Sequence, residues 1–348
     1  MRIRYSELKL HPNVLHSLTG LRPAEFEQFV GDVRPLLAVA QWERLTRSPR
    51  RPEGERKRAI GGGHPFSLPP HEQIVLSIMW LRLYPTHEVL AFLFGVDPST
   101  VSRLLSRILP VLAQAGKDTM RMPDPGRKHR RSFDQLLSEL PELAVVIDSF
   151  EQRVQRPQGP DPSNRKSRSE MDCWYSGKKR GHTIKSQVGV DLHTGSICEV
   201  SDSVRGPTAD ITLLKQSKLM ERLPEGVGAE GDLAYVGIGE LHPQHPQGSH
   251  YGNTPRRKPR GADKHRPRGQ DKPRPPEDVA YNKAFAQRRI IVEHTLCRMR
   301  SYQSLTQTDR NHRRMHTERV QAVAGAVAGA VAGLVNRKMQ SRLPYLFI

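Results

Sequence analysis

Hydrophobic and polar positions follow a helical period through the first part of the chain. Pro23 stands near the start of the first such pattern, which predicts one helix within residues 18–45. Its apolar positions are Phe26, Phe29, Val30 and Val33. A polar stretch rich in arginine and lysine follows over residues 44–63 and ends in glycines, so we interpret it as a flexible connector able to touch phosphates.

The clearest local pattern lies in residues 68–112, where three helices are predicted. The first is His71–Leu83, an apolar-periodic segment. The second is Thr86–Phe94, with a threonine able to cap its start, and it ends at Gly95, which suits a left-handed C-cap.

The third predicted helix opens with Asp97 as N-cap and Pro98 as first helical residue. Its apolar stripe consists of Val101, Leu104, Leu105 and Ile108. Its other face carries Ser99, Thr100, Ser102, Arg103, Ser106 and Arg107. A short helix, a tight turn and a helix with small polar and arginine residues outward are typical of a DNA-binding helix-turn-helix. We expect Ser99, Thr100, Arg103 and Arg107 to contact DNA, because hydroxyls bond phosphates and arginine reaches guanine edges. An ordinary helical hairpin with a solvated face is the alternative.

The pattern changes at about residue 140. Residues 1–121 form the predicted helical region, the basic Pro- and Gly-containing residues 122–139 a linker, and 140–348 a second domain. Strands are predicted at 143–147, 183–192, 197–200 and 227–231, and helices at 208–222 and from 278 onward. This order predicts an α/β fold with a mixed sheet, preceded by an all-α domain. The Pro-, His- and Arg-rich residues 242–276 predict an irregular insertion.

Composition adds a strong charge. The 55 lysines and arginines exceed the 36 acidic residues by 19, and the estimated pI is 10.2. Such a charge favours a polyanionic partner and salt-dependent binding, although a ribosome-associated or generally adhesive basic protein is the alternative. The scattered Cys173, Cys198 and Cys297 argue against a zinc site or a disulfide framework. Without a signal-peptide pattern, and with a longest apolar run (322–335) too short to span a bilayer, we expect an intracellular protein and no membrane.

Three acidic residues stand where metal ligands are often found. Asp148 ends the apolar run 143–147, Asp232 follows the predicted strand 227–231, and Glu293 lies in the last predicted helix. Carboxylates at two strand ends and on a later helix can converge on Mg²⁺ or Mn²⁺, and two such ions about 4 Å apart can promote phosphodiester cleavage. Together with the charge, this indicates a DNA-cutting enzyme.

Each acidic residue also has a purely structural interpretation. Asp148 can cap a turn, and Glu293 can pair with Arg289, although arginine before glutamate is the weaker order of such a helical pair. Glu230 and Asp210 are further carboxylates that can take the second position.

Several ordered motifs, spread over nearly the whole chain, resemble one known family. They are Asp148-Ser149-Phe150-Glu151, Tyr175-Ser176-Gly177-Lys178-Lys179 with His182-Thr183-Ile184-Lys185, Gly206-Pro207 with Ala209-Asp210-Ile211, Gly231-Asp232-Leu233-Ala234-Tyr235, and Asn253-Thr254-Pro255 with Lys258-Pro259-Arg260-Gly261. Arg289, Glu293 and Arg300 fit a signature of Arg, three residues, Glu, six residues, Lys. The family is the DDE-type transposases of bacterial insertion sequences, in the insertion-sequence-five group, akin to Harbinger-like endonucleases. Among the departures, Ser149 stands where glycine is usual, and Arg300 replaces lysine.

The resemblance implies an RNase H-like catalytic domain with Asp148, Asp232 and Glu293 as catalytic residues that hold Mg²⁺ or Mn²⁺ as two ions. The implied reaction is strand cleavage at terminal inverted repeats, followed by strand transfer into target DNA. Further implied DNA contacts are Lys178, Lys179, Lys185, Arg256, Arg257, Lys258, Arg289 and Arg300. The implied partners are double-stranded DNA and a second copy of the chain, in a bacterial cytoplasm at the nucleoid.

Two other function classes stay open. One is a catalytically silent or domesticated DNA-binding protein, against which the intact acidic triad argues. The other is a basic RNA-associated protein, against which the helix-turn-helix pattern and the lack of an RNA-binding aromatic signature argue.

Overall fold

The computed structural model describes residues 2–46, 66–123, 142–156, 173–243, 251–257 and 274–310. Contacts divide the chain into two compact units, one of Met1–Thr119 with Met299–Ile348 and one of Met120–Arg298. The described residues 299–310 group with the helical unit by these contacts, and the domain boundaries given by the sequence analysis stay a prediction. The connector from residue 47, the linker from residue 124 and the apolar run 322–335 lie outside the described residues.

The first unit is helical. Its elements are α1 (Tyr5–Leu8), α2 (Pro12–Thr19), α3 (Pro23–Thr46), α4 (Pro70–Leu83), α5 (His87–Phe94), α6 (Pro98–Lys117) and the short η4 (Gln303–Leu305). The predicted first helix corresponds to α3, and all four of its apolar positions are buried. The pattern analysis missed α1 and α2, because four and eight residues are too few to establish a helical period.

The helix-turn-helix prediction is confirmed by α4, α5 and α6. Thr86 caps α5 by accepting a hydrogen bond from the Val89 amide, and Gly95 ends it with φ +66°. The two helices α5 and α6 are bent by 101° across this turn, within the range for the motif. Asp97 stands at the N-cap of α6 in extended conformation, but its side chain makes no capping hydrogen bond, which corrects the predicted role.

Residues 299–310, far along the chain, also belong to this unit. Beyond Met299 the segment packs against α4 through η4. The buried Tyr302 hydroxyl donates to the Thr19 carbonyl over 3.4 Å, and Tyr84 donates to Asp309 over 3.2 Å. These contacts join residues more than 220 positions apart and anchor the segment after the last long helix.

The second unit is built on a mixed sheet. Its strands are β1 (Glu142–Arg153), β2 (Tyr175–Ser176), β3 (Gly181–Asp191), β4 (Ile197–Val200), β5 (Val204–Arg205), β6 (Val227–Glu230) and β7 (Gly252–Asn253). The order is β2-β3-β1-β6-β7, with β4 and β5 pairing β3. The pairs β1–β3 and β3–β4 are antiparallel, whereas β1–β6 and β6–β7 are parallel. The predicted α/β class with a mixed sheet is therefore confirmed.

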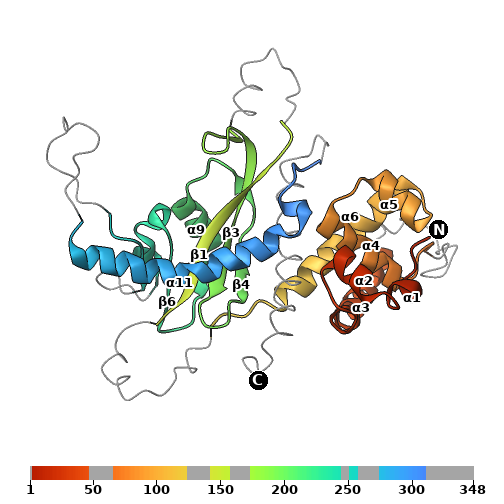
Figure 1. Ribbon diagram of the computed structural model, residues 1–348, viewed down its shortest axis with the longest axis horizontal. Helices are drawn as coiled ribbons and strands as arrows, with labels where there is room; N and C mark the ends of the chain where they lie inside the picture. The colour runs from red at the N-terminus through yellow and green to blue at the C-terminus, as the bar shows by residue number, and fades with distance from the viewer. Residues whose placement is uncertain are drawn as a thin grey trace, which may run out of the picture. The chain divides into compact units, whose positions relative to one another are not determined.

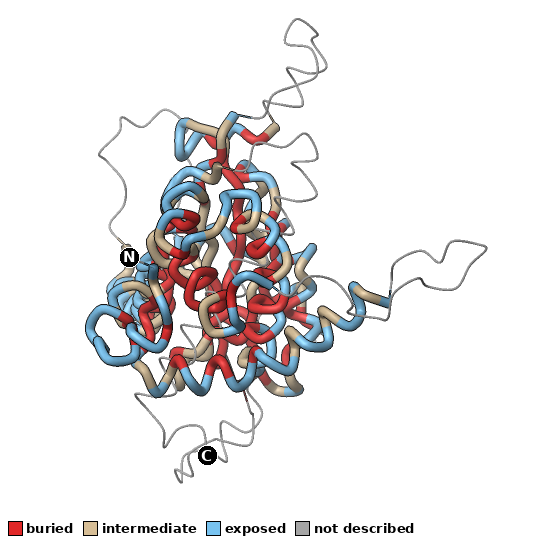
Figure 2. Tube along the Cα trace, turned by 90° about the vertical axis from the view of Figure 1, so that its right-hand side faces the viewer, coloured by how far each residue is buried: buried red, intermediate tan, exposed pale blue. Residues whose placement is uncertain are grey.

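Helices accompany this sheet: α9 (Asp210–Ser217), α10 (Leu219–Arg222) and α11 (Pro276–Arg300), with the short η2 (Leu233–Tyr235) and η3 (Ile238–Leu241). Figure 1 shows the strands at the centre of this unit, with α11 running across them. One core lies between the sheet and the segments α9 to η3, and it includes Val145, Ile147, Leu214 and Tyr235. Figure 2 shows buried residues in red in the interior and exposed residues in pale blue on the outer turns.

The structure corrects three predicted elements. Strand β1 continues to Arg153, so Asp148 lies inside the strand and not at its end. The predicted helix 208–222 is divided into α9 and α10, because Lys218 adopts a left-handed conformation with φ +54°. Within the predicted irregular insertion, residues 252–253 form β7 beside β6. Among the described residues no single helix is long and apolar enough to cross a bilayer, and α5 with α6 meets the length and composition test only as a bent pair.

Candidate active site

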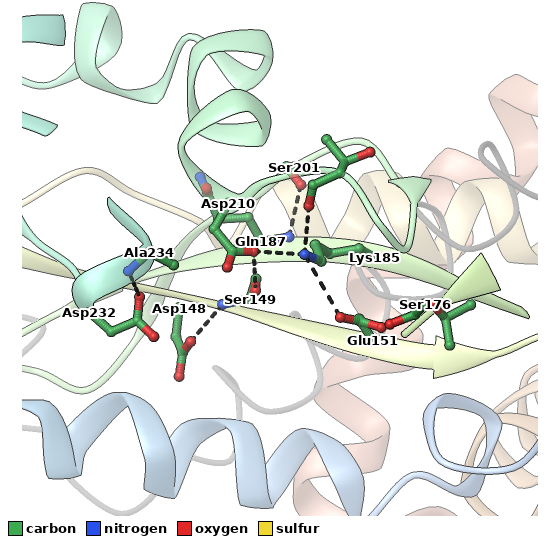
Figure 3. A network of polar contacts seen from close by, with 12 residues as sticks. Asp148, Ser149, Glu151, Ser176, Lys185, Gln187, Ser201, Asp210, Asp232 and Ala234 are labelled. Atoms are coloured by element: carbon green, nitrogen blue, oxygen red, sulfur yellow. Dashed lines mark hydrogen bonds and ion pairs between the residues drawn. The ribbon is translucent and has the colours of Figure 1, made fainter. Parts of the chain in front are cut away.

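Asp148 lies in the middle of the sheet. Its strand β1 is flanked by β3 and β6, and Asp148 pairs with Val188 of β3. Because successive side chains of a strand point to opposite faces, Asp148 and Ser149 face opposite sides of the sheet. Figure 3 shows Asp148 directed toward α11, and Ser149 directed toward Asp210 at the start of α9. The backbone amide of Ser149 donates to Asp148 Oδ1 over 2.8 Å, which holds one carboxylate oxygen in place.

Asp232 comes to the same region from the neighbouring strand. It follows β6, whose residue Glu230 pairs in parallel with Val146 of β1. The Asp232 side chain caps η2 by accepting a hydrogen bond from the Ala234 amide over 2.9 Å. Figure 3 shows the carboxylates of Asp232 and Asp148 near each other on one side of the sheet.

Glu293 lies on α11, four residues after Arg289. The Arg289 guanidinium donates to Asp148 Oδ2 over 3.2 Å. Residues four apart share one face of a helix and are separated by about 6 Å along its axis, so Glu293 is one turn from the contact with Asp148. Its side chain is exposed.

A buried ion pair fixes the same helix over the sheet. Glu230 is fully buried at the end of β6, and Arg288 binds it through Nη2 to Oε1 at 2.7 Å and Nε to Oε2 at 3.0 Å. Adjacent arginines of α11 thus reach the parallel strands, Arg288 on β6 and Arg289 on β1. Farther along α11, the buried Thr295 hydroxyl lies 3.2 Å from the Gly195 carbonyl in the β3–β4 turn.

The electrostatics of the site reflect this crowding of carboxylates. Burial raises the pKa of Asp148, and the charges of Asp232 and Asp210 add to that effect, while Arg289 opposes it. Burial, together with the charges of Asp210, Asp148 and Asp232, raises the pKa of the Tyr235 hydroxyl above its usual range, so it stays protonated. A cation close to Asp148 would therefore stabilise its ionised carboxylate.

The residues present suit a divalent cation by their chemistry. Carboxylate oxygens are the ligands that Mg²⁺ and Mn²⁺ prefer, and the Arg289 guanidinium is already a positive group at Asp148. Within the described ranges, no three acidic, histidine or cysteine side chains are close enough to form a ready-made metal site. The structure thus brings Asp148 and Asp232 together. Glu293 lies on α11 one helical turn beyond Arg289, the residue that contacts Asp148.

Lys185 has surroundings different from those expected. Its amine is buried under the opposite face of the sheet, 3.0 Å from Asp210 and 3.8 Å from Glu151, and it donates to the Thr208 carbonyl over 2.6 Å. With these partners and a side chain only 8% exposed, it is not presented to a DNA phosphate.

The other predicted DNA contacts of this unit differ in how far they are free to meet DNA. Lys178 and Lys179 are exposed in the turn between β2 and β3. Arg256 is engaged with Asp278 over 2.7 Å and with the ring of Tyr281, whereas Arg257 is exposed. Lys258 lies outside the described residues.

The helix-turn-helix candidates lie on the first turns of α6. Ser99 and Arg103 are exposed and Thr100 is half-buried, and the Arg103 guanidinium bonds the Ser99 carbonyl over 3.1 Å. Arg107 instead stacks 3.7 Å from the centroid of the Phe66 ring and donates to Gln73 over 2.6 Å. Burial lowers its pKa. Arg300 is the exposed last residue of α11.

Sequence reasoning missed two ion pairs near the site, Arg288 with Glu230 and Lys185 with Asp210. Arg288 was passed over in favour of Arg289, and Asp210 was considered only as a competing ligand. An antiparallel register would have placed Lys185 opposite Glu151 on one face, which is the signal that was available for the buried network.

Comparison with known proteins identifies the family of the chain. A family profile described as "DDE superfamily endonuclease" matches residues 147–336, and one described as "Helix-turn-helix of DDE superfamily endonuclease" matches residues 66–118. The chain is 27% identical over 273 residues to a "Probable transposase for insertion sequence element IS702" of Microchaete diplosiphon, which covers 78% of this chain and 84% of the relative. No solved structure gives a significant match. The endonuclease match spans more than half of the chain, and the chain therefore belongs to the DDE superfamily of endonucleases.

Proposed function

We propose that this protein is a transposase that cuts DNA strands at the terminal inverted repeats of its element and joins the freed ends to target DNA. The observation that carries the proposal is the meeting of Asp148 and Asp232 at neighbouring strands beneath α11, which bears Glu293. The family membership and the transposase relative support it.

In this proposal Asp148, Asp232 and Glu293 hold Mg²⁺ or Mn²⁺, as two ions. When bound, the ions supply the positive charge that activates an attacking hydroxyl and neutralises the phosphodiester. The chain prepares this site before DNA arrives, since the Ser149 amide orients Asp148 and the Ala234 amide orients Asp232. Preorganised ligands avoid the cost of rearrangement during the reaction.

Arg289 has two roles in the proposal. Without a bound cation its guanidinium neutralises Asp148, and with DNA present it turns to a phosphate near the scissile bond. Arg288 stays with Glu230 in both cases, because releasing it would leave a buried carboxylate alone.

The reaction then proceeds in two displacements at phosphorus. Water attacks the phosphodiester at the element end and leaves a 3′-hydroxyl, and that hydroxyl attacks the target strand. The helix-turn-helix reads the inverted repeat through the start of α6, where Ser99, Thr100 and Arg103 lie. Lys178, Lys179 and Arg257 bind DNA backbone, and paired ends require at least two copies of the chain.

The test is cleavage of a duplex carrying the element's own end, with Mg²⁺ or Mn²⁺. We expect defined strand cleavage by the wild-type protein and its loss in Asp232→Asn, with duplex binding retained. Asp202→Asn is the matched control, because Asp202 is an exposed aspartate between β4 and β5. Specific binding by the wild type without cleavage in either metal would refute the proposal and favour a silent DNA-binding derivative.

A further inference from the structure

We propose that Ser149, Asp210 and Lys185 form a positioning relay that fixes the carboxylate of Asp148 from the opposite face of the sheet. The relay rests on the proposed function, because its effect is on cation binding at Asp148. None of its three residues touches the reacting atoms, so each is a positioning residue.

The first link of the relay is Ser149, which has two donors. Its amide binds Asp148 Oδ1 over 2.8 Å on one side of β1, and its hydroxyl binds Asp210 Oδ1 over 2.7 Å on the other. Figure 3 shows both contacts, with Asp148 directed toward α11 and Asp210 directed from the start of α9 toward Ser149. Any shift of Ser149 therefore moves the donor that orients Asp148.

The second link holds Asp210 in place. Lys185 Nζ lies 3.0 Å from Asp210 Oδ1, and that amine is itself held by the Thr208 carbonyl at 2.6 Å. Asp210 is the first residue of α9, where the helix dipole favours a carboxylate. The Lys185 amine and the start of α9 thus hold the Asp210 carboxylate where it accepts the hydrogen bond from Ser149.

The third link fixes Lys185 within the sheet. Glu151 lies opposite Lys185 in the β1–β3 register, with the amine 3.8 Å from its carboxylate. The Thr183 hydroxyl donates to Glu151 Oε2 over 2.9 Å. Side chains of Lys185 and Glu151 are only 8% and 7% exposed, so water screens this charge network weakly.

The serine is the residue that connects the network to the site. Its backbone amide contacts Asp148 and its hydroxyl contacts Asp210, so a residue without a hydroxyl would retain the amide contact but lose the link across the sheet. The hydrogen bond to the Asp210 carboxylate thus restrains the strand at the site.

The experiment measures Mn²⁺ binding to the purified full chain by titration calorimetry, beside the metal dependence of cleavage. Ser149→Ala removes the hydroxyl of the link, and Asp210→Asn removes the charge of its acceptor and the ion pair with Lys185, while every proposed metal ligand stays in place. We expect each to weaken Mn²⁺ binding by about 10-fold or more, as losses of outer-shell partners do. Ser149→Thr, which retains a hydroxyl, should restore binding close to the wild-type value.

A matched control separates positioning from general loosening of the sheet. Ser186→Ala removes a buried hydroxyl pair on β3, in which Ser186 lies 2.8 Å from Ser203, without touching the relay. We expect it to lower the melting temperature without changing Mn²⁺ binding. The double variant of Ser149→Ala with Asp210→Asn should bind Mn²⁺ no more weakly than either single variant, because both break one link.

Unchanged Mn²⁺ binding in Ser149→Ala and Asp210→Asn, with the wild type binding and cutting normally, would overturn the relay and leave the proposed function standing. Losses that multiply in the double variant would also overturn it, because the two residues would then act separately. A wild-type protein that neither binds Mn²⁺ nor cuts DNA would remove the proposed function, and the relay with it.

Discussion

The Arg288–Glu230 pair gives the most quantitative prediction, for the variant Arg288→Met. The substitution keeps an unbranched side chain of similar length but leaves the fully buried Glu230 without its two-point partner. Removing one partner of a buried ion pair typically costs about 3–5 kcal/mol.

The assay is urea unfolding of the full chain at about pH 7, followed by circular dichroism. Because contacts divide the chain into two units, the transition of the unit Met120–Arg298 is the one to compare. We expect Glu230→Gln, added to Arg288→Met, to recover most of the lost free energy of unfolding, because glutamine carries no charge to leave unpaired.

The matched control is Arg256→Met. Arg256 pairs with Asp278 on the same helix, but its side chain is 50% exposed, and we expect little change in stability. A loss in Arg288→Met that is no larger than that of Arg256→Met, or that Glu230→Gln does not recover, would refute the reasoning that the buried Glu230 depends on Arg288.

Three further predictions concern other parts of the chain. Asp148→Asn should raise the melting temperature of the metal-free protein at neutral pH, because burial raises the pKa of Asp148 and so makes its ionised form unfavourable in the fold. The increase should shrink as pH falls and the wild-type carboxyl becomes protonated, and an equal increase at all pH values would contradict this. Gly252→Ala should destabilise the sheet by about 1–3 kcal/mol in urea unfolding, because a methyl group there meets the Gly239 amide and lies 2.6 Å from Ile238 Cγ2. Thr86→Ala should cost about 0.5–1 kcal/mol in the helical unit, since it removes the N-cap of α5, and Thr86→Ser should not.

The helix-turn-helix was predictable because its signals are local. Thr86, Gly95 and Pro98 mark helix boundaries by their own conformational preferences, and the stripe of α6 is continuous in sequence. The α/β class was predictable for the same reason, since the apolar runs of β1, β4 and β6 are short and separated by turn residues such as Gly195.

The continuation of β1 past Asp148 could not be predicted from local pattern. Its residues Ser149 and Glu151 are polar, and they point to a face that a half-buried strand would fill with apolar side chains. They remain in the strand because Asp210 and Thr183, from distant segments, satisfy them. Such tertiary partners are absent from a local window of sequence.

The site was predictable in part. The sequence pointed to Asp148 and Asp232, which lie near each other in the structure, and the catalytic roles of both and of Glu293 stay predictions. Lys185 was misjudged because its burial follows from pairing with Glu151 across two strands, and a surface lysine has the same local sequence signature.

The most direct test of the central claim is the position of Mn²⁺ in crystals of the full chain soaked with the ion. Anomalous diffraction locates manganese without assumptions about the protein. The account predicts manganese between the carboxylates of Asp148 and Asp232, with Glu293 as a further ligand and Arg289 moved away from Asp148. Manganese bound elsewhere, with the Arg289–Asp148 pair intact, would contradict the account.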